Sequence, residues 1–237
     1  MRQLVLPKKI IAQIEQAVAV YGENREQFAN LAQRVERDLV EHATLRPLIH
    51  STKRREKDPA HLRQKLERKA KEALASGKRF TITDKTLFRS IGDLAGVRLL
   101  HIHTEQLSVI HPTIMHILDF HKYKRREQPL VYIWDIERND FFKGLGLDVR
   151  ARPSMYTSVH YVVEPHWGGV ACEIQVRTLA EELWGEVSHT INYPDVTKSI
   201  ACAEQLAALA RVASGCTRLV DSIFASMSEH KNKLLGK

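Results

Sequence analysis

The chain has 237 residues, with 36 lysines and arginines against 28 aspartates and glutamates, so its formal net charge is +8. This length suits one large domain or one domain with helical additions, and a hydrophobic content of 43% excludes a disordered chain. No apolar run approaches the roughly 18 residues of a membrane span. We therefore expect a cytoplasmic protein with no membrane contact. Its positive charge points to an anionic partner such as a nucleotide, RNA or an acidic protein, although a soluble protein with a basic surface would have the same charge.

The N-terminal region is predicted to be helical over residues 8–45. Apolar residues recur there at the three-and-four spacing of one helical face: Phe28, Leu31, Val35 and Leu39. Pro47 ends this stretch. Residues 50–73 are strongly basic and contain the start of a second helix, with Asp58 as its cap and Pro59 in its first turn.

The middle of the chain alternates between segments typical of strands and segments typical of helices. We predict strands at 97–102, 131–137, 158–164 and 170–177, and helices at 105–121 and 179–189. Residues 138–155 have little periodicity and contain Gly144 and Gly146, so we interpret them as a loop. The glycines of residues 165–169 predict a hairpin-like connection between the last two strands.

The C-terminal segment has the most regular helical pattern. Its apolar stripe steps by alternating fours and threes through Cys202, Leu206, Leu209, Ala213, Cys216, Val220, Ile223 and Met227. Such stripes usually pack on their own domain, which we favour here. Self-association into a homo-oligomer through the same stripe is the alternative.

Several familiar sites are absent from the sequence. It contains no GxxxxGK[ST] phosphate loop, no HExxH zinc helix and no GxSxG nucleophile elbow. The three cysteines, Cys172, Cys202 and Cys216, form no CxxC pair, which argues against a structural zinc site and against a disulfide framework.

Charged residues lie at the ends of two predicted strands instead. Asp93 immediately precedes one strand, and Glu173, Gln175 and Arg177 share one face of another because side chains alternate along a strand. Such a polar row is costly in a core unless its members are paired, although a solvent-facing sheet would also carry it. Two carboxylates on neighbouring strands beside a basic helix could form a Mg²⁺–nucleotide site, because Mg²⁺ prefers one or two carboxylates plus phosphate oxygens.

Five sequence blocks occur in a characteristic order: residues 55–66 (REKDPAHLRQKL), 93–98 (DLAGVR), 156–160 (YTSVH), 173–178 (EIQVRT) and 184–189 (WGEVSH). This series resembles the synthetase domain of the RelA/SpoT family of alarmone synthetases. The resemblance covers about residues 40–195. It implies an α+β fold with a mixed β-sheet flanked by helices, related to the nucleotidyltransferases. The domain division would be an N-terminal helical extension at 1–45, the synthetase domain at 46–195 and a C-terminal helix at 196–237.

The resemblance also implies the reaction. Members of this family transfer the β,γ-pyrophosphate of ATP, with Mg²⁺, to the 3′-hydroxyl of GDP or GTP, and AMP leaves. Some small toxic relatives use adenine nucleotides or the 3′ end of tRNA as the acceptor, and an antitoxin partner would then be expected. The sequence contains no His-Asp dipeptide, so the hydrolase centre of the bifunctional members is missing.

By position in these blocks, the ATP site would be formed by five basic side chains. Arg55 and Arg98 would sandwich the adenine, which suits their flat guanidinium groups. Lys57 and Lys65 would hold the phosphates, with His61 close to them.

The catalytic and acceptor residues are implied in the same way. Asp93 would bind Mg²⁺, and Glu173 would bind it too or accept the proton of the attacking hydroxyl. Tyr156 would stack on the acceptor base, and Arg152 aligns with a lysine that faces acceptor phosphates. Four further side chains would line the acceptor and pyrophosphate region: His160, Gln175, Arg177 and His189.

The acceptor block departs from the family pattern. Where the family usually has Asn-Gly-Tyr-Arg-Ser, this chain has Ser154-Met155-Tyr156-Thr157-Ser158. The glycine's backbone freedom and the arginine's phosphate contact are both lost. A guanosine nucleotide is our first choice of acceptor. An adenosine nucleotide, the 3′ end of tRNA, and a catalytically weak nucleotide- or RNA-binding module remain as alternatives.

Overall fold

The computed structural model describes residues 5–152, 154–192 and 196–235, and within them seven strands form one mixed sheet of order β1-β2-β7-β6-β4-β5, with β3 paired to β6. The strands are β1 Ser51–Glu56, β2 Ala95–His101, β3 Lys124–Arg125, β4 Leu130–Ile133, β5 Asp148–Ala151, β6 Ser158–Glu164 and β7 Cys172–Thr178. The β2–β7 and β4–β5 pairs are parallel, and the other pairs are antiparallel. The mixed sheet confirms the predicted fold class.

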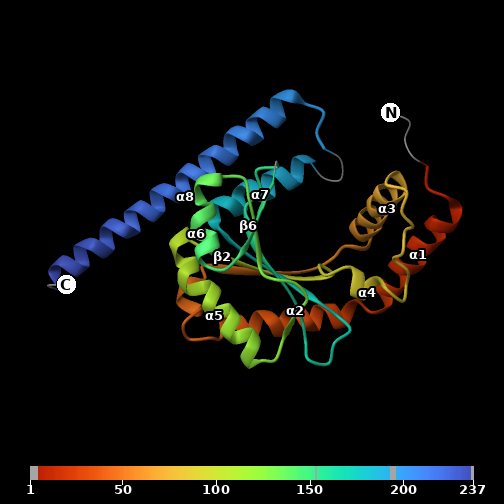
Figure 1. Cartoon of the computed structure of the whole chain (residues 1–237), viewed down its shortest axis with the longest axis horizontal. Coiled ribbons are helices and arrows are strands. Elements are labelled where there is room, and N and C mark those ends of the chain that lie inside the picture. The colour runs from red at the N-terminus through yellow and green to blue at the C-terminus, as the bar shows by residue number, and fades with distance from the viewer. Residues whose placement is uncertain (1–4, 153, 193–195, 236–237) are drawn as a thin grey trace.

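Helices cover both faces of this sheet. They are α1 Lys8–Glu23, α2 Arg25–Val40, α3 Pro59–Ala75, α4 Leu87–Ser90, α5 Leu107–Phe120, α6 Asn139–Gly144, α7 Leu179–Asn192 and α8 Ile200–Leu234. Helices α2 and α5 lie along one side of the sheet, and α7 and α8 lie on the other (Figure 1). A hydrogen bond of 2.8 Å between His111 Nδ1 on α5 and the Tyr161 hydroxyl on β6 fixes α5 to its side. The described residues contain no helix with the length and apolarity of a membrane span.

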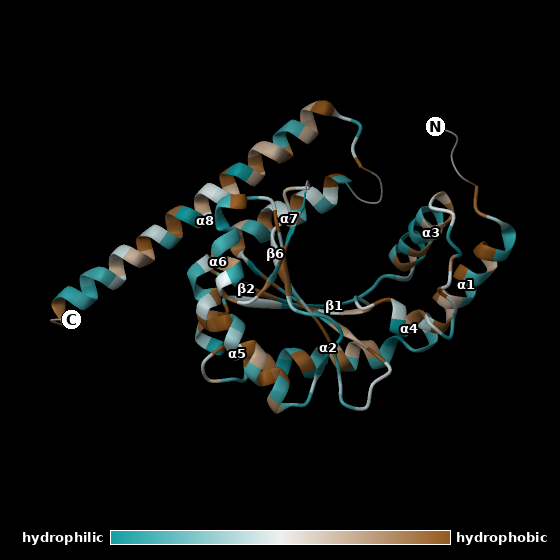
Figure 2. Ribbon diagram, viewed as in Figure 1, coloured by the Kyte–Doolittle hydropathy of each residue, from teal (hydrophilic) through white to brown (hydrophobic). Residues whose placement is uncertain are grey.

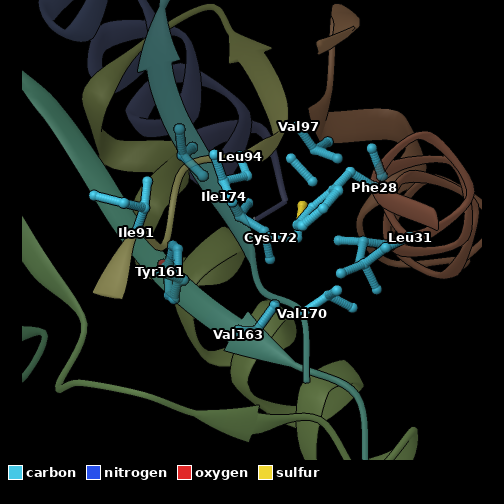
Figure 3. Packing of buried hydrophobic residues seen from close by; sticks show 14 of the residues in the cluster. Phe28, Leu31, Ile91, Leu94, Val97, Tyr161, Val163, Val170, Cys172 and Ile174 are labelled. Carbon is cyan, nitrogen blue, oxygen red and sulfur yellow. The ribbon is translucent and has the colours of Figure 1, made fainter. Parts of the chain in front are cut away.

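The hydrophobic core fills the space between α2 and the sheet. Phe28 and Leu31 of α2 pack towards Val97 of β2 and towards Cys172 and Ile174 of β7 (Figure 3). Removing each of these large side chains from water stabilises the fold by about 1.5–3 kcal/mol. Because side chains alternate along β7, the residues between these apolar ones point to the opposite face, where α7 lies.

The N-terminal segment corrects two of our expectations. Residues 8–45 do not form one helix: α1 and α2 are separated at Asn24, which has φ −107° and ψ 11°. Strand β1 lies inside the basic stretch and was not predicted, because its sequence, Ser-Thr-Lys-Arg-Arg-Glu, has no apolar alternation. It is an edge strand held by antiparallel pairing to β2. The predicted cap of α3 is confirmed, since Asp58 accepts from the backbone N–H groups of Ala60 and His61.

The interpretation of residues 138–155 as a loop is wrong. The segment contains α6 and β5, and β4 ends at Ile133 rather than at residue 137. These elements are too short to show periodicity in the sequence. Buried Phe142 and Leu147 attach the segment to the core. The connection over 165–169 does join two antiparallel strands, with Gly168 and Gly169 at positive φ.

Helix α8 packs on its own domain along part of its length. The buried stripe is Leu206, Ala210, Ala213 and Thr217, and the indole N–H of Trp184 donates to the Leu206 carbonyl at 3.0 Å. This stripe rotates away from the predicted seam, whose Ile223 is 58% exposed. Figure 2 shows apolar residues continuing towards the C-terminal end of α8, where the helix extends beyond the sheet. Self-association through that exposed face stays a prediction.

The division into 1–45, 46–195 and 196–237 also stays a prediction. Its second boundary lies at residues 193–195, outside the described residues. Side chains of α1 and α2 share one hydrophobic cluster with the sheet, among them Ile14, Tyr21 and Phe28. The N-terminal helices are therefore part of the core that positions the strands.

Candidate active site

A cavity of about 610 Å³ opens beside α3, where the predicted ATP residues gather. Its lining is Arg55, Lys57, His61, Gln64, Lys65, Glu67, Arg68, Lys71, Glu72, Asp93 and His189. Arg98 lies outside it but shares with Arg55 a small hollow of about 10 Å³ over Gly96. A Cβ at Gly96 would come within 3.3 Å of the Arg55 side chain. The two arginines expected to hold the adenine are thus neighbours.

Asp93 lies between two lysines at the wall of this cavity. Its carboxylate oxygens are 2.7 Å from Lys57 Nζ and 2.8 Å from Lys65 Nζ. Burial pushes the pKa of Asp93 upward, but the two ammonium charges outweigh it and hold that pKa well below its usual range. Burial lowers the pKa of Lys57, against the charge of Asp93. The result is an ionised carboxylate whose two partners can also bind phosphate.

Tyr21 connects the N-terminal extension to this cluster. Its hydroxyl lies 2.7 Å from the carbonyl oxygen of Lys57 and 3.3 Å from that of Leu94, the residues that adjoin Asp58 and Asp93. The side chain is fully buried, and burial raises its pKa to about 12. Tyr21 therefore fixes the backbone on both sides of the Lys57–Asp93 ion pair.

We expect Tyr21→Phe to destabilise the fold by about 1–2 kcal/mol, because the Lys57 carbonyl loses the hydroxyl that donates to it and the Leu94 carbonyl keeps only the backbone N–H of Lys57. We also expect a raised KM for ATP, since the ion pair at Asp93 loses its backbone support. Urea unfolding and initial rates measure the two effects. Tyr123→Phe is the matched control: its hydroxyl bonds Asp38 at 2.8 Å, remote from the cavity, so stability falls while the KM stays. Equal KM values in both variants would contradict this role of Tyr21.

Glu173 is the centre of a second polar cluster, on the sheet face opposite the core. One carboxylate oxygen lies 3.0 Å from His160 Nδ1, and the other accepts from Gln175 Nε2 at 2.6 Å. Burial pushes the pKa of Glu173 upward, but the hydrogen bond and positive charge of His160 outweigh it, so that pKa lies below its ordinary value. Glu173 is thus ionised at neutral pH, as a proton acceptor must be.

The cluster continues from His160 to the predicted acceptor residues. His160 Nε2 lies 3.2 Å from the Tyr156 hydroxyl, which accepts from Arg177 Nη2 at 2.6 Å. Arg177 also donates to Gln175 Oε1 at 3.0 Å. Burial raises the pKa of Tyr156. The prediction that Glu173, Gln175 and Arg177 share one face is confirmed, and the row is paired as its burial requires.

His189, which we expected near the acceptor and the pyrophosphate, lines the large cavity together with His61. The two rings are 6.3 Å apart, edge to face. Burial lowers the pKa of His189, which favours its neutral form. The structure therefore places it on the side of Asp93, away from the network of Tyr156 and Arg177.

Tyr132 on β4 is a site residue that we did not predict. The Arg152 guanidinium lies 4.0 Å from the centre of its ring, and the centres of the Tyr132 and His160 rings are 5.0 Å apart in an edge-to-face arrangement. Tyr132 pairs with Ser158 across the sheet and so points to the face of His160. Strand alternation in Leu-Val-Tyr-Ile was the available signal. Arg152 is thereby held beside the predicted acceptor residues, as expected.

Glu182 and Glu186, one turn apart on α7, were also missed. Arg98 Nη1 lies 2.5 Å from Glu182 and 2.6 Å from Glu186. Glu182 also accepts from Arg177 Nη1 at 3.0 Å. Their four-residue spacing was visible in the sequence, but only the packing of α7 beside β2 and β7 shows which arginines they meet.

Met155 carries the backbone strain that the missing glycine predicts. Its φ is +58°, the left-handed region that glycine adopts without cost. Its side chain packs with Trp134 and Trp184, on the side of the site where α8 lies. The acceptor block thus holds a bulky side chain in a left-handed backbone conformation, and stored strain is common at functional sites.

The described residues contain no cluster of three or more His, Cys, Asp or Glu side chains placed to hold a metal. Asp93 and Glu173 remain as two half-buried carboxylates, close enough for the charge of Asp93 to act on the pKa of Glu173. This donor set is too small for a metal bound by protein alone. It fits Mg²⁺ that shares its coordination with phosphate oxygens and water.

Comparison with known proteins identifies the family. Residues 54–198 match the model of the region found in RelA / SpoT proteins. The chain belongs to the RelA/SpoT family. No curated protein is similar enough in sequence to match.

Solved structures show the same fold. Small alarmone synthetase 1 from Bacillus subtilis superposes with a TM-score of 0.55 at 19% identity, over 91% of this chain and 97% of that one. The same protein bound to its product pppGpp gives 0.53 at 18% identity, over 93% and 97% of the chains. A GTP pyrophosphokinase family protein from Streptococcus pneumoniae gives 0.51 at 18%, over 95% and 97%. This RelA/SpoT chain thus has the fold of these neighbours along nearly its whole length.

Proposed function

We propose that this RelA/SpoT chain is an ATP-dependent pyrophosphokinase that transfers the β,γ-pyrophosphate of ATP to the 3′-hydroxyl of a guanosine nucleotide. One observation carries the proposal: a lysine-held carboxylate at a large basic cavity lies just before strand β2, and an ionised, hydrogen-bonded carboxylate lies on β7, the parallel neighbour of β2. The first suits a nucleoside triphosphate and the second suits an attacking hydroxyl. Neighbours of this fold bound to pppGpp and to AMPCPP support the choice of nucleotides.

In this proposal different residues of the chain contact the adenine, the phosphates and the Mg²⁺ of bound ATP. Arg55 and Arg98 hold the adenine, and Lys57 and Lys65 turn from Asp93 to the phosphates. Asp93, released from one or both lysines, then becomes available to Mg²⁺. Mg²⁺ when bound would neutralise charge on the triphosphate.

The transfer itself requires one proton acceptor. The 3′-oxygen of the acceptor nucleotide forms a bond to the β-phosphorus of ATP. The bond from that phosphorus to the α–β bridging oxygen breaks, so AMP leaves. Glu173 takes the proton of the hydroxyl. His160 and Gln175 fix the Glu173 carboxylate, and Tyr156 and Arg152 orient the acceptor.

The 3′ end of tRNA is the second candidate acceptor. The observations that favour it are the net charge of +8 and Thr157 at the position of the family's arginine, which leaves a mononucleotide with fewer phosphate contacts. The chain would then act as a toxin, and we would expect an antitoxin partner. Either product would be made in the cytoplasm.

A transfer assay distinguishes the candidates. Purified protein receives ATP labelled at the β-phosphate, Mg²⁺ and one acceptor per reaction: GDP, GTP, AMP, ADP, ATP or deacylated tRNA. We expect the label on GDP or GTP. Label on tRNA, with a rate that falls steeply between 50 and 200 mM salt, would establish the toxin activity, because phosphate contacts release counterions. Binding of ATP with no transfer to any acceptor would favour a nucleotide-binding module.

A further inference from the structure

One carboxylate on α7, that of Glu182, contacts both Arg98, a predicted ATP residue, and Arg177, a predicted acceptor residue. Glu182 Oε1 lies 2.5 Å from Arg98 Nη1, and Glu182 Oε2 accepts from Arg177 Nη1 at 3.0 Å. The side chains of Glu182, Arg98 and Arg177 are only 13%, 13% and 4% exposed. Each oxygen thus serves one arginine, and neither arginine has ready access to water as a replacement partner.

Gln175 supplies a second connection between the same two arginines. Its Oε1 accepts from Arg98 Nε at 3.3 Å and from Arg177 Nη2 at 3.0 Å. Its Nε2 donates to Glu173. The two arginines are therefore bound to two common acceptors, so a turn of one guanidinium disturbs the bonds of the other.

The backbone of α7 is fitted to this arrangement. Gly185, one turn after Glu182, lies against Arg177, and a Cβ built at Gly185 would be 2.7 Å from Arg177 Nη1. An alanine here would displace the guanidinium that Glu182 binds. The close approach of Arg177 to α7 thus depends on glycine at this position.

We propose that Glu182 couples the ATP site to the acceptor site as a positioning residue, by fixing Arg98 and Arg177 relative to one another. This inference rests on the proposed function, in which Arg98 contacts ATP and Arg177 contacts the acceptor. A nucleotide that orders one arginine orders Glu182 and, through it, the other arginine. The second nucleotide then meets a site that is already ordered, and the two bind with positive, reciprocal coupling.

Calorimetry tests the coupling without turnover. AMPCPP is titrated into the protein with and without a saturating amount of the acceptor that takes the label in the transfer assay. In the unmodified chain we expect the acceptor to tighten AMPCPP binding about fivefold or more. In Glu182→Gln we expect that factor to fall close to one. A glutamine can accept at Oε1 only, and its Nε2 would face the other guanidinium.

Glu186→Gln is the matched control. Glu186 pairs with Arg98 and Lys53, whereas the ion pair of Arg177 on α7 is with Glu182. Its loss should weaken AMPCPP binding and leave the coupling factor unchanged. Gly185→Ala, which leaves every carboxylate in place, should lower the coupling factor and serves as the test if Glu182→Gln does not fold.

The outcomes separate this inference from the proposed function. A folded protein that binds no AMPCPP, or that transfers label to no acceptor, overturns the proposed function. Transfer with the same coupling factor in the unmodified chain, Glu182→Gln and Gly185→Ala overturns only the role of Glu182. Equal loss of coupling in Glu186→Gln also overturns it, because the effect would then come from Arg98 alone.

Discussion

Glu173→Gln is expected to lose pyrophosphate transfer by about 10²–10⁴-fold while the protein stays folded. The amide cannot take the proton of the attacking hydroxyl. One Glu173 oxygen lies 3.0 Å from His160 Nδ1. An amide offers one accepting oxygen and one donating NH₂ group in place of two accepting oxygens, so the substitution also disturbs this hydrogen bond. Initial rates with β-labelled ATP measure the loss, and circular dichroism with urea unfolding checks the fold.

Glu164→Gln is the matched control for that experiment. Glu164 lies at the end of the neighbouring strand β6 and pairs with Arg126 at 2.8 Å, outside the network of Glu173. It removes the same charge from the same sheet. We expect activity within a factor of two or so of the unmodified chain, because this half-buried ion pair shares no hydrogen bond with the Glu173 network. Full activity in Glu173→Gln would remove this residue from the mechanism.

The pKa of Glu173 predicts the acid limb of the pH profile. The proton acceptor must be ionised, and the His160 contact holds the pKa of Glu173 below its ordinary value despite burial. The midpoint of the activity loss caused by protonation of Glu173 should therefore lie below about pH 4.3, the pKa of an unperturbed glutamate. Loss of His160 in His160→Ala should move this limb to higher pH, because burial would then act on Glu173 with less opposition.

Asp93→Asn is expected to impair both the fold and the use of ATP. Asparagine leaves Lys57 and Lys65 facing one another without the anion that both now contact. Breaking one partner out of a buried ionic cluster costs about 3–5 kcal/mol, and Asp93, at 15% exposed, should fall near the lower end. AMPCPP binding should lose its dependence on Mg²⁺, because a carboxylate oxygen is no longer offered to the ion.

The difference in unfolding free energy between Asp93→Asn and the unmodified chain should depend on pH. The folded-state pKa of Asp93 is depressed, so its contribution is fully present above the unfolded pKa of about 3.9 and is lost as pH falls below it. Urea unfolding should give a constant gap between Asp93→Asn and the unmodified chain from pH 7 to about 5, and a smaller gap at pH 3. Asp119→Asn, at an exposed ion pair with Arg125, should show no such gap. An unchanged Mg²⁺ response in Asp93→Asn would contradict its metal role.

Features fixed by neighbours in the sequence were predictable. The Asp58 cap depends on residues two and three positions away, and the shared face of Glu173 and Gln175 depends on strand alternation alone. In both cases the local chemistry and the tertiary structure favour the same arrangement. Asp93 and its two lysines are distant in the sequence, and they were predicted from blocks whose order resembles one family.

Features fixed by distant partners were not predictable. Strand β1 is basic and exposed, and it is a strand because β2 pairs with it. On α8, Thr217 takes a buried position where Cys216 was expected, because its hydroxyl meets Thr178 of β7. Asp221 follows on the same face, 2.5 Å from Arg138. The spacing of apolar residues cannot identify a helix face that packs partly through polar side chains such as Thr217 and Asp221.

The same limit applies to the site. Tyr132 lies on β4, which reaches the site because it pairs with β6 in the sheet. Glu182 meets Arg98 and Arg177 only because α7 turns back beside β2 and β7. A single sequence shows which side chains are available for such a network. It does not show how the helix and the strands pack to bring those side chains together.

The most direct test of the central claim is a product balance with ATP labelled at the β-phosphate. Incubation with Mg²⁺ and the preferred acceptor should release AMP and a 3′-pyrophosphorylated product in a one-to-one ratio, with all transferred label in that product. Formation of ADP instead, or AMP with free pyrophosphate in the presence of every acceptor offered, would contradict pyrophosphate transfer by this site.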